Sequence, residues 1–293
     1  WEIILSILPT GKSHVSFSEV KNWAECPWRH KLIYIDKLLP EIKSEHLDFG
    51  TAVHASCEKY LKTKELDVEM CVELIRKAWQ EKGFPDVEKW VGWATVVLND
   101  VPQFLEEKFP GWEVYAAELP LMESIDGLDV KFKGFIDGVI KIKDGKGKEK
   151  VLILDWKTGP AYGWSTDKKR DFLTQAQLVL YKFYVMRLLG LQSSDIKTCF
   201  IVLKKGAKPG KSIDFVDFSA GPTLQENANK IMSAEFDYFK LSNSCQVNPC
   251  IHKSATSPPS GDFNVELKRY NNVRVKGDVS DAVCEKLSDY RMN

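Results

Sequence analysis

The sequence lacks several features that would place it in a specialised class of protein. No apolar run approaches the ~18 residues that cross a membrane, and no internal repeat is present. The apolar stretch at residues 1–8 has no basic leader, which makes it a poor secretory signal. Seven scattered cysteines, an odd number, argue against a disulfide scaffold. We therefore expect a protein of a reducing, cytoplasmic compartment with no membrane partner.

An excess of one charge is also missing, since 41 Lys and Arg residues balance 41 Asp and Glu residues. A neutral total argues against nucleic acid as a partner. The balance is uneven, however, because residues 131–211 contain 18 basic and seven acidic side chains. The candidates for phosphate contacts in this basic segment are Lys168, Lys169, Arg170, Lys204, Lys205, Lys208 and Lys211. The neutral total is thus an average over a basic segment and an acidic remainder.

The apolar residues follow a helical spacing first and a strand pattern later. Helical spacing predicts helices over about 46–62, 67–81, 90–109, 170–189 and 223–239. Strand patterns predict strands over about 112–121, 130–142, 151–154, 196–203 and 213–218. Near the N-terminus, Ser16 and Ser18 indicate the start of a further helix, which Pro27 disturbs. This order predicts an α/β fold with a helical N-terminal part.

The strongest local signal for chemistry lies at the end of an apolar strand. Asp155 and Lys157 are two residues apart, so they project from the same side of the strand. A carboxylate and an ammonium beside an apolar run are costly unless they pair or hold a metal ion. A simple structural Asp–Lys pair explains this segment equally well.

A second acid favours the metal interpretation. Asp137 interrupts the apolar run Gly134–Ile140, and a hairpin between the two strands would bring it close to Asp155. Two close carboxylates raise each other's pKa unless a divalent cation compensates. Oxygen ligands suit Mg²⁺ or Mn²⁺. Lys157 would then stabilise developing negative charge or orient the attacking water.

The arrangement D-x17-D-x-K resembles the PD-(D/E)XK nuclease superfamily, and specifically its RecB-like branch, which includes CRISPR-adaptation and phage-recombination exonucleases. Further motifs match that branch in the expected order along residues 16 to about 250. They are the S-x-S motif at 16–18 with Cys26-Pro27, the G-x-x-x-H motif from Gly50 to His54, the G-F-I-D motif at 134–137, the D-x-K-T-G motif at 155–159 and the Q-x-x-x-Y motif at 177–181.

The resemblance implies a restriction-endonuclease-like fold, in which helices flank a central mixed sheet. It implies a helical N-terminal part at residues 1–110 that covers the cleft and carries the first motifs, a nuclease core at 111–242, and a C-terminal extension at 243–293 with a Cys-containing loop. It also implies Mg²⁺- or Mn²⁺-dependent hydrolysis of phosphodiester bonds in DNA. The host type that it implies is bacterial or phage-like.

The site residues that the resemblance implies fall into two sets. The implied catalytic residues are Asp137, Asp155, Lys157, Gln177 and Tyr181. The implied metal ligands are His54, Asp137, Asp155 and the backbone carbonyl of Trp156. Glu118, in the preceding strand, is a further candidate ligand, although a Glu beside Pro120 is as often solvated. His54 alone would be an ordinary helix histidine, as Gln177 and Tyr181 would be ordinary helix residues.

Some relatives in this branch hold a [4Fe–4S] cluster with one Cys before the core and three after it. Cys26, Cys245 and Cys250 match three of those positions, and the fourth is missing, so a vestigial or absent cluster is the favoured interpretation. His252 as a substitute, or zinc at Cys245, Cys250 and His252, is a weaker alternative. The other cysteines that follow helix or strand patterns, Cys57, Cys71 and Cys199, are predicted to be core residues.

The functional hypothesis is a DNA nuclease, favouring an exonuclease, that acts on single-stranded DNA or duplex ends in DNA processing, recombination or repair. Tyr162, Trp164 and Trp156 could stack on bases, although core packing is at least as good an explanation for Trp156. The alternatives are a structure-specific endonuclease, an RNA nuclease, and a non-catalytic nucleic-acid or protein-binding module with the same fold. No G-x-x-x-x-G-K-[ST] loop is present, so a helicase or recombination protein would be a separate partner.

Overall fold

The computed structural model describes residues 10–25, 30–37, 40–41, 43–125, 130–218 and 274–275. Two units emerge from the contacts within the chain, and each is described by itself. The first unit holds the sheet and the helices that pack on it, largely within residues 44–237. Within the part of the chain described, no helix is long and apolar enough to span a bilayer.

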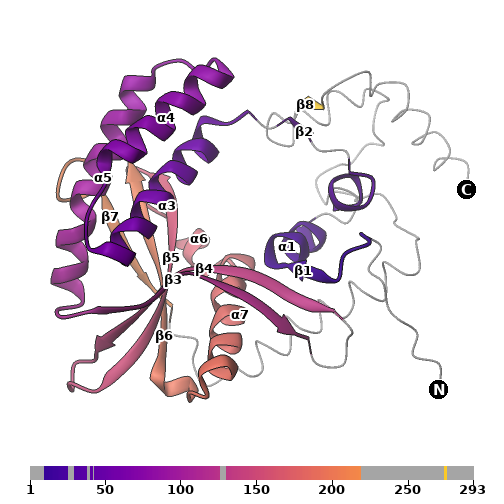
Figure 1. The fold of residues 1–293 in the computed structure, drawn as a ribbon, viewed down its shortest axis with the longest axis vertical. Helices are drawn as coiled ribbons and strands as arrows, with labels where there is room; N and C mark the ends of the chain where they lie inside the picture. Colours follow the sequence, from indigo (N-terminus) through magenta and orange to yellow (C-terminus); the bar gives the residue numbers. More distant parts are fainter. Residues whose placement is uncertain are drawn as a thin grey trace, which may run out of the picture. The chain divides into compact units, whose positions relative to one another are not determined.

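A six-stranded mixed sheet forms the centre of the first unit (Figure 1). Its order is β1-β4-β5-β6-β7, and β3 pairs with the other edge of β4. The strands are β1 (His14–Ser16), β3 (Glu113–Ser124), β4 (Lys131–Lys143), β5 (Glu149–Pro160), β6 (Ile196–Lys205) and β7 (Ile213–Asp217). The pairs β1–β4 and β5–β6 are parallel, and the remaining pairs are antiparallel.

Strand β4 has one edge that is paired along most of its length and one edge with a gap. Strand β3 pairs with the first of these edges from residue 131 to residue 141 of β4. On the opposite edge, β1 pairs only with residues 131–133 and β5 only with residues 138–143. Residues 134–137 therefore have no partner strand on that edge among the strands described. We call this segment the unpaired edge of β4.

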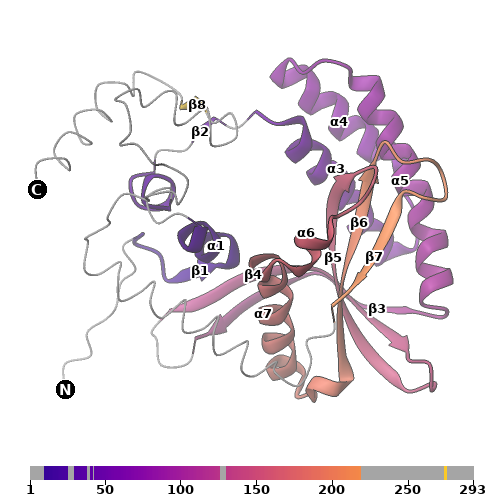
Figure 2. The same cartoon turned by 180° about the vertical axis from the view of Figure 1, so that it is seen from behind.

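On one face of the sheet lie two helices, α3 (Glu45–Thr63) and α5 (Val87–Lys108), with α4 (Val68–Lys82) packed on both of them, and one long helix lies against the other face (Figures 1 and 2). The buried side chains of α3, α4 and α5 share one apolar core with alternate residues of β4, β5 and β6, such as Ile140, Leu154 and Ile201. Against the opposite face packs α7 (Phe172–Leu189), which follows the short α6 (Thr166–Arg170).

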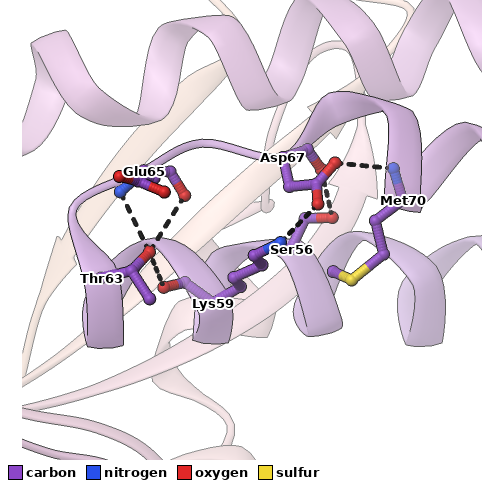
Figure 3. Close-up of polar contacts among 6 residues, drawn as sticks. All are labelled: Ser56, Lys59, Thr63, Glu65, Asp67 and Met70. Atoms are coloured by element: carbon purple, nitrogen blue, oxygen red, sulfur yellow. Dashed lines mark hydrogen bonds and ion pairs between the residues drawn. The ribbon is translucent and has the colours of Figure 1, made fainter.

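Polar contacts at the turn between α3 and α4 fix the C-terminal half of α3 (Figure 3). The Asp67 side chain accepts a hydrogen bond from the backbone N–H of Met70 at 2.8 Å, which caps the first turn of α4. The same carboxylate pairs with Lys59 at 2.5 Å, and Ser56 donates to the Asp67 carbonyl at 3.0 Å. Two side chains of α3 are thereby tied to the start of α4.

The second unit contains α1 (Phe17–Glu25), the π-helical turn η1 (Lys31–Ile35) and the short antiparallel pair β2 (Pro40–Glu41) and β8 (Arg274–Val275). Its described side chains include a buried acid, Glu19, which lies 3.4 Å from Lys12 and 3.5 Å from His30. The His30 ring stacks on Tyr34 at 4.9 Å.

The predicted fold class is confirmed, because a mixed sheet lies between helices. The helices predicted over 46–62, 67–81, 90–109 and 170–189 correspond to α3, α4, α5 and α7, and the five predicted strands correspond to β3 to β7. The sequence did not predict β1, whose three residues are too few to show a period. The predicted helix over 223–239 lies outside the described residues. The division at residues 110 and 242 stays a prediction.

Candidate active site

The two acidic residues meet where β4 and β5 stop pairing. The last pair in the β4–β5 ladder is Gly138 with Leu154, so Asp137 and Asp155 are the next residues along each strand. Beyond this pair a side-chain hydrogen bond takes the place of backbone pairing between the two strands. Oδ2 of Asp137 accepts a hydrogen bond of 2.7 Å from the backbone N–H of Trp156. The unpaired edge of β4 thus ends in a carboxylate that is anchored to β5.

His54 brings an imidazole ring to the same place from α3. Its Nδ1 atom lies 3.7 Å from Oδ2 of Asp137. Burial lowers the pKa of His54 to about 4, although Asp155 opposes that shift. The imidazole is consequently neutral near pH 7, which is the form that can coordinate a metal ion.

Asp155 is 1% exposed, and it lies beside one positive charge. Lys157 Nζ lies 2.6 Å from Oδ2 of Asp155, so the two side chains form an ion pair. Burial raises the pKa of Asp155 to about 6, with Asp137 adding to the shift and Lys157 opposing it. Burial also raises the pKa of Asp137 to about 6. A divalent cation would relieve both costs.

A chain of hydrogen bonds positions Lys157 from the opposite side. Lys157 Nζ donates to Oε1 of Gln177 at 3.1 Å, and Nε2 of Gln177 donates to the Tyr181 hydroxyl at 3.0 Å. Gln177 and Tyr181 are one turn apart on α7, so they face the sheet together. A Cβ atom at Gly134 would lie 3.0 Å from the Tyr181 ring, so the glycine permits this close approach of α7.

A cavity of about 320 Å³ opens between α3 and this part of the sheet. Its lining residues are Thr51, His54, Ala55, Glu58, Glu118, Asp137 and Trp156. Glu118 has a φ of 51°, which is unusual for a non-glycine residue inside a strand. Nearby Glu58 is the main cause of the raised pKa of Glu118. The two acids therefore gather at the cavity beside Asp137.

Glu58 is the residue that the sequence analysis missed. It lies one helical turn after His54 on α3, so the spacing of four residues was the available signal. A glutamate on the polar side of an amphipathic helix is usually a solvated surface residue, and only the packing of α3 over the sheet places this one at the cavity.

The structure brings together the predicted residues of the core: His54, Glu118, Asp137, Asp155, Lys157, Gln177 and Tyr181. Their carboxylate oxygens suit Mg²⁺ or Mn²⁺. Within the described ranges, no group of three or more His, Cys, Asp or Glu side chains is placed so that it could hold a metal ion. The candidate side chains instead make pairwise contacts around the end of the β4–β5 ladder, such as that between His54 and Asp137.

Other predicted residues have different outcomes. The Trp156 side chain is buried in the core between α3–α5 and the sheet, so core packing, not base stacking, explains it. Cys57, Cys71 and Cys199 are buried free thiols, as predicted. The possible iron–sulfur ligands Cys26, Cys245 and Cys250, and the alternative ligand His252, lie outside the described residues.

The lysines and the arginine predicted to contact phosphate also differ in their surroundings. Lys204 forms an ion pair with Asp214 at 2.7 Å, and Lys205 lies 2.9 Å from Nδ1 of His46. The candidates on α6, which are Lys168, Lys169 and Arg170, are exposed.

A mixed sheet with helices on both faces, which presents two acids and a lysine at the ends of neighbouring strands, defines a nuclease-type fold of the restriction-endonuclease-like class. Residues 14–250 match the PD-(D/E)XK nuclease superfamily, and the chain belongs to this superfamily. A suspected exonuclease from Eubacterium rectale has a similar crystal structure, with a TM-score of 0.54 and 13% identity over 86% of this chain and 92% of that one.

Two phage proteins are similar in sequence. The Gene 69 protein of Mycobacterium phage D29 is 26% identical over 243 residues, which cover 72% of this chain and 84% of the phage protein. The Gene 69 protein of Mycobacterium phage L5 is 24% identical over 255 residues, which cover 70% of this chain and 82% of the phage protein.

Proposed function

We propose that this nuclease-family protein is a Mg²⁺- or Mn²⁺-dependent deoxyribonuclease that hydrolyses phosphodiester bonds from DNA ends. The observation that carries the proposal is the meeting of Asp137, Asp155 and His54 beside Lys157, with both carboxyl pKa values raised by burial. Superfamily membership supports a nucleic-acid substrate. The exonuclease designation of the structural neighbour accords with action at ends.

Each residue has a distinct role in this proposal. Asp137, Asp155, His54 and the Trp156 carbonyl would bind the cation, which supplies a Lewis acid and lowers the pKa of a bound water. Lys157 presents a positive charge that would stabilise the negative charge developing on the scissile phosphate. Gln177 holds the Lys157 ammonium through its carbonyl oxygen, and Tyr181 in turn fixes the Gln177 amide.

The cellular setting is part of the same proposal. Processing of DNA ends in recombination or repair, in the cytoplasm of a bacterial or phage-infected cell, would suit a nuclease that works with a separate helicase or recombination protein. A structure-specific endonuclease, an RNA nuclease or a non-catalytic binding module are the alternatives that the first experiment must separate.

End-labelled and circular substrates distinguish these functions. Linear single-stranded DNA, linear duplex DNA, circular single-stranded DNA and an RNA of matched sequence should each be incubated with Mg²⁺, Mn²⁺ or chelator. We expect loss of label from linear DNA only, dependent on the cation and abolished in Asp155→Asn. Asp167→Asn, on the exposed helix α6, is the control and should cleave like the parent. Cleavage of circles would indicate an endonuclease, and cleavage by Asp155→Asn in chelator would overturn the proposed mechanism.

A further inference from the structure

The hairpin formed by β3 and β4 presents a row of exposed side chains that leads up to Asp137. Directly opposite residues on an antiparallel pair project to the same side, and so do residues two apart along a strand. Phe135 lies opposite Pro120, Lys133 opposite Met122, and Lys131 opposite Ser124. We call these six residues the β3–β4 stripe.

The stripe is apolar and basic at the same time. Phe135 is 48% exposed and Met122 is 46% exposed, although large apolar side chains on a sheet are usually covered. Lys133 Nζ lies 5.7 Å from the centroid of the Phe135 ring. The stripe itself carries no acid, because Glu123 lies opposite Phe132, on the other side of the hairpin.

Packing on the opposite side prevents Phe135 from turning inward. The alternate residues Phe132, Gly134 and Ile136 are buried, and the Phe132 ring stacks on Tyr184 of α7 at 4.8 Å. Tyr181 of the same helix packs on this buried side as well, since a Cβ atom at Gly134 would lie 3.0 Å from its ring. The exposed ring is therefore held outward by the same helix that positions Lys157.

Phe135 also lies on the unpaired edge of β4, two residues before Asp137. At about 3.3 Å per strand residue, its Cα atom is roughly 7 Å from that of Asp137. A nucleotide next to the phosphate at the carboxylates would be within reach of the Phe135 ring. Lys133 and Lys131 follow at the same interval along β4, so they would add positive charge along a strand that continues past Phe135.

We propose that the β3–β4 stripe binds the single-stranded part of the DNA substrate next to the scissile phosphate. Phe135 stacks on an unpaired base, and Lys133 and Lys131 contact the phosphates that follow. Inside a duplex both faces of every base are covered by its neighbours, whereas an unpaired strand leaves base faces open to such a ring, so the site favours single-stranded ends over closed duplex. This inference rests on the proposed function, since it assumes a nucleic-acid strand at Asp137 and Asp155.

Binding is best measured apart from cleavage, by fluorescence anisotropy of a labelled single-stranded oligonucleotide with the full chain carrying Asp155→Asn. On this background we expect Phe135→Ala to weaken binding by about 5- to 150-fold, the range for loss of one base–aromatic stack. Phe135→Trp should keep the affinity of the background protein, because it retains an aromatic ring. Phe135→Leu, which keeps apolar area without the ring, should weaken binding as Phe135→Ala does. Tyr115→Ala, at an equally exposed aromatic position elsewhere on β3, should bind like the background protein.

The lysines have a separate signature. Lys133→Gln should reduce the slope of log affinity against log salt concentration by about one and affect all base sequences equally. A blunt duplex should be insensitive to Phe135→Ala. Melting temperatures that match the parent would show that the exposed substitutions leave the fold intact.

The outcomes separate the two proposals. Unchanged binding by Phe135→Ala, in a protein whose parent cleaves DNA, overturns the stripe and leaves the proposed function standing. Absence of any nucleic-acid binding or cleavage by the parent overturns both. If Phe135→Ala changes self-association in sedimentation and leaves DNA binding intact, the stripe is a protein-docking surface and the proposal is wrong.

Discussion

The Asp137 carboxylate and the backbone N–H of Trp156 are joined by a hydrogen bond of 2.7 Å across the end of the β4–β5 ladder. The bond fixes Asp137 to the residue that follows Asp155, so the two carboxylates are positioned by one side-chain contact. It also satisfies a backbone donor that the separation of the strands would leave without a partner.

Two substitutions at Asp137 separate its structural and chemical roles. Asp137→Asn can still accept from Trp156 through its amide oxygen, so stability should hold while cleavage falls by at least about 100-fold. Asp137→Ala should lose cleavage equally and also destabilise the protein by about 1–3 kcal/mol, because the Trp156 N–H loses its acceptor. Urea denaturation and single-turnover cleavage measure the two effects. Equal stability of both variants would show that the hydrogen bond is dispensable.

The raised carboxyl pKa values predict how cation binding depends on pH. Asp137 and Asp155 have pKa values of about 6 in the folded protein without a cation, against ordinary values near 4. Protons therefore compete with the cation below pH 6, and the affinity for Mn²⁺ should fall steeply as pH decreases from 7 to 5. Calorimetry in buffers of different ionisation enthalpy should detect proton release in this range. An affinity independent of pH would contradict it.

The same shift predicts a change in stability with a definite sign. A carboxyl whose pKa is raised by folding destabilises the folded state above that pKa, and the cost disappears as pH falls towards the unfolded value. In chelator, Asp155→Asn should therefore melt at a higher temperature than the parent at pH 8, and the difference should shrink at pH 5. Thermal scans at the two pH values test this, and a lower melting temperature at pH 8 would be the opposite result.

The hydrogen bonds that link Lys157, Gln177 and Tyr181 predict that substitutions reduce the cleavage rate less with each step away from Lys157. Lys157→Met should abolish cleavage, because no other cation of the described part contacts Asp155. Gln177→Leu should reduce the rate by roughly tenfold, since Lys157 loses a hydrogen bond worth about 1.5 kcal/mol. Tyr181→Phe should have the smallest effect, because Gln177 still contacts Lys157. Single-turnover rates would reveal whether this order holds; a Tyr181→Phe effect larger than that of Gln177→Leu would break it.

Substitution of Glu58 should change both the pKa of Glu118 and the binding of a cation at the cavity. Glu58→Gln removes the main cause of the raised pKa of Glu118, so that carboxyl should titrate at lower pH. If the cavity contributes to cation binding, the affinity for Mn²⁺ should fall several-fold, with Glu69→Gln on α4 as the surface control. Calorimetric titration of both variants gives the comparison. Identical affinities for the parent and Glu58→Gln would restrict the cation to His54, Asp137 and Asp155.

The sequence could predict the elements and the central residues of the site because both leave local patterns. Apolar periodicity specified the helices that became α3, α4, α5 and α7, and the run Val151–Leu154 indicated a covered central strand. Asp155 and Lys157 stand out because ionisable side chains are rare beside such a run. Asp137 does so for the same reason.

Other features depend on contacts between segments far apart in the chain, and no local pattern reports those. The strand β1 forms only because residues 14–16 pair with residues 131–133 of β4, which are more than 100 positions away in the sequence. Glu58 joins the site because α3 packs over Glu118, and Trp156 turns its ring into the core because the side chains of β5 alternate between faces.

The residue types and their order, by themselves, determined that this protein has an α/β fold and that two acids and a lysine stand at the ends of apolar strands. Only the tertiary structure decided where the β4–β5 ladder ends, which carboxylate is buried, and which aromatic ring faces outward beside Asp137. The reason is physical. The periodicity of apolar residues shows which face of a helix or strand is apolar. The pKa shifts, hydrogen-bond partners and exposure of a side chain depend instead on the groups that folding brings next to it from distant parts of the chain.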